Sequence, residues 1–147
     1  MTEEARFFRA SAEDLGALEG LFPRDYHDRV RQVLDRTIDV YAVEYAGLPV
    51  GRLVANYENQ HLDSETAPNV RACLSHFILL KEYRNRGLGS GLMRFALDDL
   101  RERGYREFTV GVEDGNAAAK HIYFAFGFTE KIDHGSDPCE YDLYLKR

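Results

Sequence analysis

The stretch Tyr83-Arg84-Asn85-Arg86-Gly87-Leu88-Gly89-Ser90-Gly91 decides how this chain of 147 residues is interpreted. It lies between an apolar segment at 71–80, typical of a buried strand, and a periodic segment at 86–103, typical of a helix. A glycine-rich turn of this kind exposes backbone N–H groups at the start of a helix, where those donors and the helix dipole favour phosphate. Glycine permits close approach of a ligand because it has no Cβ. The stretch predicts a phosphate-binding turn, and a plain helix start is the alternative.

Three phosphate-binding patterns can be tested against this turn. A P-loop needs G-x-x-x-x-G-K-S/T, and no glycine of the chain is followed by lysine and a hydroxyl residue. A dinucleotide fingerprint needs G-x-G-x-x-G, but the sixth position counted from Gly87 is Leu92. The third pattern, R/Q-x-x-G-x-G/A, is matched by Arg84, Gly87 and Gly89.

Hydrophobic periodicity divides the rest of the chain into strands and helices. An N-cap at Ser11 opens the first helix, and Val30, Val33 and Leu34 should form the apolar side of the second. Strands are expected at 5–9, 39–45, 50–57, 71–80, 106–112, 128–133 and 140–146, and helices at 11–22, 25–37, 86–103 and 116–126. This order predicts an α/β (α+β) fold with a single mixed, mostly antiparallel, six- to seven-stranded sheet flanked by about four helices.

The composition restricts the classes of function. A net charge of −6 argues against non-specific binding of nucleic acid, which needs a basic surface. No apolar run approaches the roughly 20 residues of a membrane span, and the acidic start of the chain is unlike a signal peptide. We expect one domain over residues 1–147, in the cytoplasm, with neither a nucleic-acid nor a membrane partner. Cys73 and Cys139 are too few for a disulfide framework or a zinc site, so free thiols and no metal are expected.

Residues 74–128 resemble the core of the GNAT acetyltransferases. The strand and the glycine-rich turn resemble the family's fourth strand and its pyrophosphate loop. Further along, Asn116-Ala117-Ala118-Ala119-Lys120-His121-Ile122-Tyr123, followed by Phe126-Gly127-Phe128, is similar to the family's N-x-x-A…Y…G-F segment. The order and spacing of the two motifs agree with the family. The hairpin at 40–57, with Pro49-Val50-Gly51 after its turn, is also similar to it.

The resemblance implies acetyl-CoA as cosubstrate and a role for each matching residue. The backbone of Phe77, Ile78 and Leu79 would pair with the pantetheine arm as an added strand does. Asn116 would hydrogen-bond the cofactor near its thiol end, and Tyr123 would lie by the sulfur. The pyrophosphate would be held, chiefly by backbone N–H groups, at Arg84, Asn85, Arg86, Gly87, Leu88, Gly89 and Ser90.

The reaction that the resemblance implies is direct attack of a neutral amine on the thioester in a ternary complex. The backbone N–H of Leu79 would donate to the oxyanion, and Tyr123 would be the general acid for the thiolate. An alkylammonium has a pKa of about 10, so its proton must be removed, either by a base or through a chain of water to solvent. Gly111 stands where related N-terminal acetyltransferases often carry glutamate. Glu113 is the candidate base closest in sequence to the implied cofactor residues, and the others are Asp114, Glu44, Glu58 and His76.

Other functions and the acceptor stay open at this point. A non-catalytic acyl-CoA-binding sensor is the main alternative, and a nicotinamide-dependent oxidoreductase is a remote one. The acceptor would be a primary amine of a small molecule, a peptide or a protein, and the chain would be a monomer or a homodimer. Five acidic residues could attract a cationic amine or be ordinary surface charge, which is the interpretation we favour: Asp25, Asp28, Glu58, Asp63 and Glu65.

Overall fold

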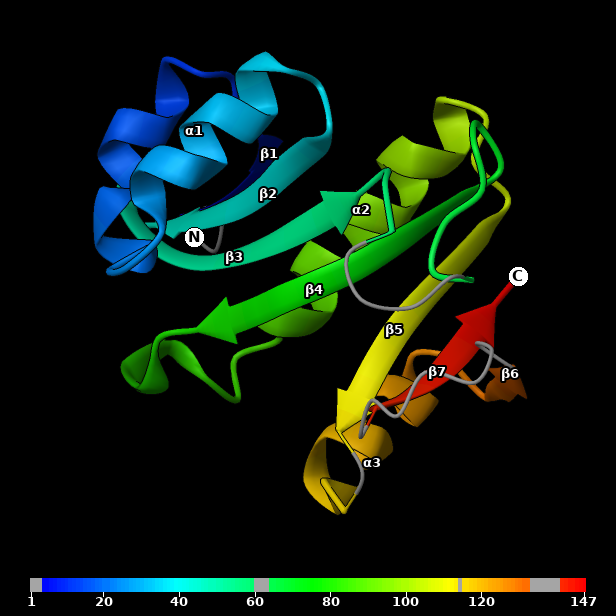
Figure 1. Cartoon of the computed structure of the whole chain (residues 1–147). Coiled ribbons are helices and arrows are strands. Elements are labelled where there is room, and N and C mark those ends of the chain that lie inside the picture. The colour runs from blue at the N-terminus through cyan, green and yellow to red at the C-terminus, as the bar shows by residue number, and fades with distance from the viewer. Residues whose placement is uncertain (1–3, 60–63, 114, 133–140) are drawn as a thin grey trace. The chain divides into compact units, whose positions relative to one another are not determined.

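The computed structural model describes residues 4–59, 64–113, 115–132 and 141–147 (Figure 1). Seven strands form one mixed sheet in the order β1-β2-β3-β4-β5-β7-β6, which confirms the predicted fold class. Along the chain the elements are β1 (Ala5–Arg9), the 3-10 helix η1 (Asp14–Leu21), α1 (Tyr26–Leu34), β2 (Ile38–Tyr45), β3 (Leu48–Asn56), β4 (Arg71–Leu79), the 3-10 helix η2 (Lys81–Tyr83), α2 (Leu88–Glu102), β5 (Glu107–Glu113), α3 (Ala117–Ala125), β6 (Glu130–Ile132) and β7 (Tyr141–Lys146).

The chain divides into two compact units. Unit 1 holds residues 1–55 and 76–100, and unit 2 holds residues 56–75 and 101–147. Strand β4 therefore contributes to both, with its first half in unit 2 and its second half in unit 1.

Unit 1 contains the hairpin of β2 and β3 that the sequence predicted, with β1 on the other side of β2. Strand β1 pairs antiparallel with β2, from Ala5 opposite Tyr45 to Arg9 opposite Tyr41. Between β2 and β3 the two turn residues, Ala46 and Gly47, have φ values of 52° and 83°. Two left-handed residues in succession are what a two-residue hairpin loop requires. The strand after the turn begins at Leu48, two residues earlier than expected.

The first helical segment is a 3-10 helix. Its buried residues, Leu15, Leu18 and Leu21, are three apart, which is the repeat of a 3-10 turn. They pack in a cluster with residues of β2 and β3, including Val40, Ala42 and Val54. The N-cap of η1 is Glu13, not Ser11 as expected, because the helix begins at Asp14. Ser11 and Asp14 nevertheless bond reciprocally, since Ser11 N donates to Asp14 Oδ2 at 2.9 Å and Asp14 N donates to Ser11 Oγ at 3.2 Å.

The expected apolar side of α1 is wrong at one position. Val30 and Val33 pack against the cluster of η1, β2 and β3, but Leu34 is 64% exposed. Successive helix residues point about 100° apart. The buried side of α1 includes Tyr26, Val30 and Val33, so Leu34 turns away from it.

Helix α2 presents a continuous apolar side. Leu88, Leu92, Ala96 and Leu100 are all buried, as the sequence predicted, together with Met93 and Leu97. Gly104 follows the helix with a φ of 102°, the left-handed conformation of a C-terminal cap. Within unit 1, Asp99 of α2 accepts a hydrogen bond from Tyr41 Oη at 2.6 Å and pairs with Arg9 at 3.2 Å.

Unit 2 is built on β5. Residues 71–74 of β4 pair parallel with residues 107–110 of β5. Strand β7 pairs antiparallel with both β5 and β6. The last two strands are those expected, although β6 begins at Glu130, and the expected Gly-Ser-Asp-Pro turn between them lies outside the described residues.

We predict that Gly51→Ala lowers the free energy of unfolding by about 1–3 kcal/mol, because an overpacked site must shift its neighbours. A Cβ at Gly51 would lie 2.7 Å from Leu79 Cδ1 and 3.0 Å from Ile78 O. Gly20→Ala is the matched control, since a Cβ there would meet no atom within 4 Å. Urea unfolding of the two variants measures the difference, and equal midpoints would show that β3 and β4 do not need glycine at this contact.

Candidate functional site

The loop between β4 and α2 has the backbone geometry of an anion site. Asn85 and Gly87 have φ values of 64° and 79°. Left-handed residues in a turn direct neighbouring N–H groups into one concave surface. No residue in the first turn of α2 is acidic, so no side-chain carboxylate there offsets the positive end of the helix dipole. This geometry suits an anionic group, and the binding of phosphate by the loop stays a prediction.

Gly89 is not required by the packing of the chain itself. A Cβ at this position would lie 3.5 Å from Phe77 Cζ, an ordinary van der Waals contact. The residue lies in the first turn of α2, where φ is helical. The absence of a side chain at Gly89 therefore leaves space at the start of α2 that no atom of unit 1 fills.

The two arginines of the loop have protein contacts of their own. Arg84 Nε donates to Leu79 O at 3.0 Å, which holds its guanidinium by the end of β4. The guanidinium of Arg86 lies 5.5 Å from the ring centre of Tyr45 and 5.4 Å from that of Tyr83, within reach of a cation–π interaction. Both cations stay beside the loop and can contribute charge to it.

The second half of β4 leads into this loop. Phe77 and Leu79 are half-buried and Ile78 is exposed. His76, just before them, has a φ of 55°, which is uncommon for a residue other than glycine. After the strand, Leu80 N donates to Val50 O at 2.8 Å. The structure thus places the three predicted pantetheine-pairing residues and the predicted phosphate loop together in unit 1.

The other predicted motif forms the start of α3 in unit 2. Asn116 is the N-cap, and its side chain accepts a hydrogen bond from Ala119 N at 3.1 Å. The cap uses the Oδ1 atom of Asn116 as the acceptor, and the Nδ2 amide group takes no part in it. Tyr123 follows two turns later on the same side of the helix. Asn116 and Tyr123 therefore lie on the same side of α3, two turns apart.

The surroundings of Tyr123 raise its pKa above the ordinary value of a tyrosine. The side chain is half-buried, and its ring meets Phe128 edge-on with the centres 6.0 Å apart. Burial is the main cause that raises the pKa of Tyr123, and the charge of a Cys73 thiolate adds to the effect. The phenol therefore keeps its proton at neutral pH, as a general acid must.

Cys73 is a buried free thiol, as expected. Burial raises the pKa of Cys73 to about 12, the charge of Glu65 adds to this, and a hydrogen bond with Thr109 opposes it. The thiolate, which is the nucleophilic form, is therefore scarce at neutral pH. Cys139 lies outside the described residues.

The interpretation of the five acidic residues as surface charge is wrong for Glu65, which is buried. Its residue is only 5% exposed, and its backbone oxygen accepts a hydrogen bond from Thr109 Oγ1 at 2.7 Å. The loop that precedes β4 is also tied back by Arg71 Nη1, which donates to Ser64 O at 2.9 Å. These are contacts between distant residues, so no local pattern in the sequence marks Glu65 as buried.

The candidate bases are scattered over the described residues. Glu113 is exposed at the end of β5, and Glu58 and His76 are exposed too. Glu44 accepts a hydrogen bond from Arg6 Nε at 3.0 Å in unit 1. Asp114 lies outside the described residues.

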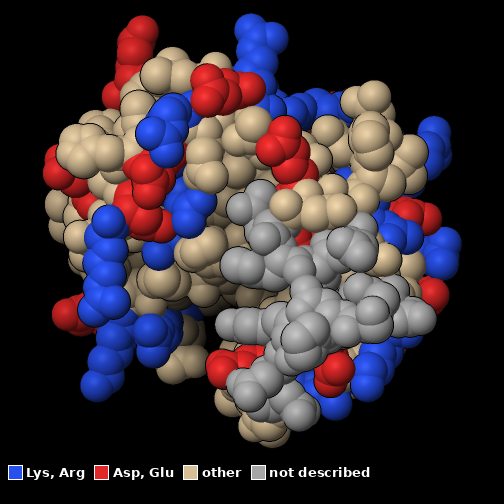
Figure 2. Space-filling view, viewed as in Figure 1, with Lys and Arg blue, Asp and Glu red and all other residues tan. Residues whose placement is uncertain are grey.

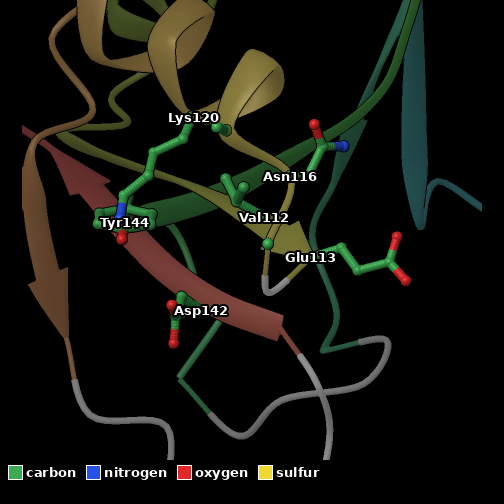
Figure 3. Close-up of a pocket in the computed structure, with 8 residues that line it drawn as sticks. Val112, Glu113, Asn116, Lys120, Asp142 and Tyr144 are labelled. Atoms are coloured by element: carbon green, nitrogen blue, oxygen red, sulfur yellow. The ribbon is translucent and has the colours of Figure 1, made fainter.

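A small pocket opens between α3 and the strands β5 and β7 (Figure 3). Its volume is about 130 Å³, well below the roughly 300–1,000 Å³ of a typical ligand site. Lys120 Nζ lies over the ring of Tyr144 at 5.5 Å, while Asn116 and Glu113 point to the other side in the view. The pocket is therefore too small to be a cofactor site. It is lined by Val112, Glu113, Gly115, Asn116, Ala117, Lys120, Asp142 and Tyr144.

The described surface mixes the two signs of charge. On the face drawn in Figure 2, Lys and Arg side chains lie among Asp and Glu side chains. Within the described ranges no cluster of three or more His, Cys, Asp or Glu side chains could hold a metal. No helix in that part of the chain is long and apolar enough to cross a membrane. The expected absence of metal, nucleic-acid and membrane partners stays a prediction.

Known proteins share both the sequence pattern and the fold. N-alpha-acetyltransferase 30 of Schizosaccharomyces pombe is 28% identical over 88 residues, which are 56% of this chain and 59% of that protein. The chain thus matches about three fifths of that relative's length.

Solved structures extend the likeness over the full fold. The PaiA N-acetyltransferase of Thermoplasma acidophilum, solved in complex with coenzyme A, aligns with a TM-score of 0.71 and 16% identity over 97% of this chain and 98% of that one. A GNAT family acetyltransferase of Elizabethkingia anophelis, solved with acetyl-CoA bound, aligns with a TM-score of 0.69 and 13% identity over 99% of each chain. Residues 6–128 match the model of the acetyltransferase (GNAT) family, and the chain belongs to that family.

Proposed function

We propose that the chain is an N-acetyltransferase, which moves the acetyl group of acetyl-CoA to a primary amine of a small molecule, a peptide or a protein. The observation that carries the proposal is the loop after β4, with left-handed residues at Asn85 and Gly87 and unused room at Gly89. Membership of the family and neighbours with bound CoA or acetyl-CoA support the same cofactor. The name of the yeast relative supports an amine acceptor.

Unit 1 would bind the cofactor through its backbone. The backbone of Phe77, Ile78 and Leu79 would pair with the pantetheine arm as an added strand pairs with a sheet, with the N–H of Leu79 left for the oxyanion. The N–H groups of the loop would hold the pyrophosphate, with Arg84 and Arg86 adding positive charge. The loop residues in this role are Arg84, Asn85, Arg86, Gly87, Leu88, Gly89 and Ser90.

The chemistry would need one donor for each developing charge. The amine nitrogen attacks the carbonyl carbon, the C–S bond breaks, and the backbone N–H of Leu79 donates to the oxyanion. Tyr123 gives its proton to the departing sulfur, since a phenol with an ordinary pKa of about 10 is protonated at neutral pH. Asn116 would hydrogen-bond the cofactor near the thiol. Glu113 is our proposal for the group that takes the proton of the amine.

Direct transfer to the amine fits the state of Cys73. An acyl-enzyme would need a thiolate in the site, and the pKa of this buried thiol is about 12. The amine itself is therefore proposed to attack the thioester in a ternary complex. The cytoplasmic location and the monomeric or homodimeric state remain predictions from the sequence.

Gly89→Glu should weaken acetyl-CoA binding by about 100-fold or more, since an added carboxylate beside a phosphate costs several kcal/mol. Calorimetric titration measures the change. Gly89→Gln is the matched control, because it adds a side chain of the same size without the charge and so isolates the effect of the charge. A parent that binds no acetyl-CoA, or a Gly89→Glu variant that binds as the parent does, would contradict the proposed site.

Tyr123→Phe should lower kcat by about 100-fold and leave the Kd of acetyl-CoA nearly unchanged, because only the acid is removed. Release of free CoA with a panel of amines measures turnover. Tyr105→Phe is the matched control, since this tyrosine of unit 2 stacks on Tyr57 at 5.3 Å and has no proposed role. Binding of acetyl-CoA without turnover of any amine would instead favour the non-catalytic sensor.

The Cys73 thiol should react at least about 1,000-fold more slowly with iodoacetamide at pH 8 in the native protein than in urea. The thiolate fraction falls tenfold for each unit by which the pKa exceeds the pH, and the folded pKa is about 12 against a usual value of 9.0. A Cys139→Ser background leaves Cys73 as the single thiol. The raised pKa also links this thiol to the pH dependence of folding. Its contribution to the free energy of unfolding is fully present below about pH 9 and decreases as the pH rises from 9 toward 12. Comparable rates of alkylation with and without urea would show that Cys73 is accessible and could carry an acyl group.

A further inference from the structure

Arg52 of β3 is a cation inside unit 1. The residue is only 4% exposed. Its Nε donates to Leu21 O at 2.6 Å and its Nη1 donates to His76 O at 3.0 Å. The guanidinium carbon lies 4.4 Å from the ring centre of Phe22. The charge is therefore held by two backbone carbonyls and one aromatic face.

A buried charge with such partners is costly. Desolvation lowers the pKa of Arg52, the charge of Arg29 adds to the effect, and the charge of Asp25 opposes it. The Asp25 carboxylate, however, is hydrogen-bonded to Arg29 Nε at 3.0 Å. Carbonyl oxygens offset less of the desolvation of a cation than a carboxylate does. An apolar side chain would avoid this cost, so the value of Arg52 lies in the atoms that it holds.

One of these atoms belongs to the unusual residue of β4. His76 has a φ of 55° within a strand. A left-handed residue other than glycine persists only where its surroundings impose that conformation, and such residues gather at ligand sites. The bond from Arg52 fixes the carbonyl of His76. Phe77, Ile78 and Leu79 follow directly, and the strand is fixed again where Leu80 N donates to Val50 O.

We propose that Arg52 is a positioning residue, which holds His76 in its left-handed conformation and so presents the backbone of Phe77, Ile78 and Leu79 to the pantetheine arm. This inference rests on the proposed function for the role of those three residues. Arg52 acts through the backbone of β4 and touches neither cofactor nor acceptor. Its bond to Leu21 O fixes the guanidinium from the other side, at the end of η1.

The side-chain chemistry suits this task. The guanidinium is a rigid, planar fork that donates in two directions and stacks on an aromatic ring, whereas a lysine ammonium is a point charge on a flexible chain. Arg52→Lys therefore keeps the charge but cannot reproduce both bonds and the stacking on Phe22. Arg52→Met keeps much of the volume and removes all the donors.

Hydrogen exchange and cofactor binding together test the inference. In Arg52→Met we expect the amides of residues 77–79 to exchange about tenfold faster, and the Kd of acetyl-CoA to rise about tenfold, the effect of losing one buried hydrogen bond. Arg52→Lys should show a smaller change in the same direction. Arg31→Met is the control, because it removes an exposed arginine that pairs with Asp28 at 3.1 Å, and it should leave both quantities as in the parent.

Distinct outcomes overturn the inference. Unchanged exchange at residues 77–79 would do so, as would faster exchange spread evenly over unit 1, which is the mark of a purely structural role. A rise confined to the KM of the amine would assign Arg52 to the acceptor instead. If Arg52→Met does not fold, Arg52→Lys decides by the same criteria. A parent that binds no acetyl-CoA would refute the proposed function, while the exchange data would still decide whether Arg52 holds β4.

Discussion

Hydrogen bonding along β4 sets the constraint on which the described structure depends. Residues 71–74 pair in parallel with β5 in unit 2. In unit 1 the end of the strand approaches β3 so closely that a Cβ at Gly51 would crowd Ile78 O and Leu79. Between these two regions lies His76, with its left-handed backbone. Because a strand has a fixed spacing of donors and acceptors, one residue out of the extended conformation is enough to change what the following amides face. The glycine-rich loop and α2 then continue directly from this second half.

The fold could be predicted to the extent that its signals are local. The hairpin turn, the apolar side of α2 and the cap at Gly104 each depend on a few neighbouring residues, and each was found where the sequence indicated. The errors have physical reasons. Leu15 and Leu18 fit either helix type, and both Leu21 and Phe22 are buried in the same cluster, so the local pattern does not distinguish a 3-10 helix from an α-helix. Leu34 has the right spacing for a buried position but lies beyond the side of α1 that the core uses.

The candidate site, like the fold, combines features with a local signal in the sequence and features that depend on contacts between distant residues. Asn85, Gly87 and Asn116 could be identified from their motifs, because backbone turns and helix caps are encoded by the residues that form them. The burial of Glu65 and the partners of Arg52 could not, because Thr109 and His76 are far from them in the sequence. Such contacts exist only after the chain has folded. The identity of the acceptor is of this second kind, since it depends on side chains from several segments rather than on one motif.

The stacking of Arg86 on Tyr45 and Tyr83 has a practical consequence. The chain has nine tyrosines and no tryptophan, so tyrosine rings dominate its ultraviolet emission. Two of those rings lie 5.7 Å apart beside the glycine-rich loop, with a cation over both. Any anion that draws the guanidinium away would change the electric field at these chromophores. Binding of an anion at the loop would therefore be expected to change the tyrosine signal, which would allow occupancy to be followed without an attached dye.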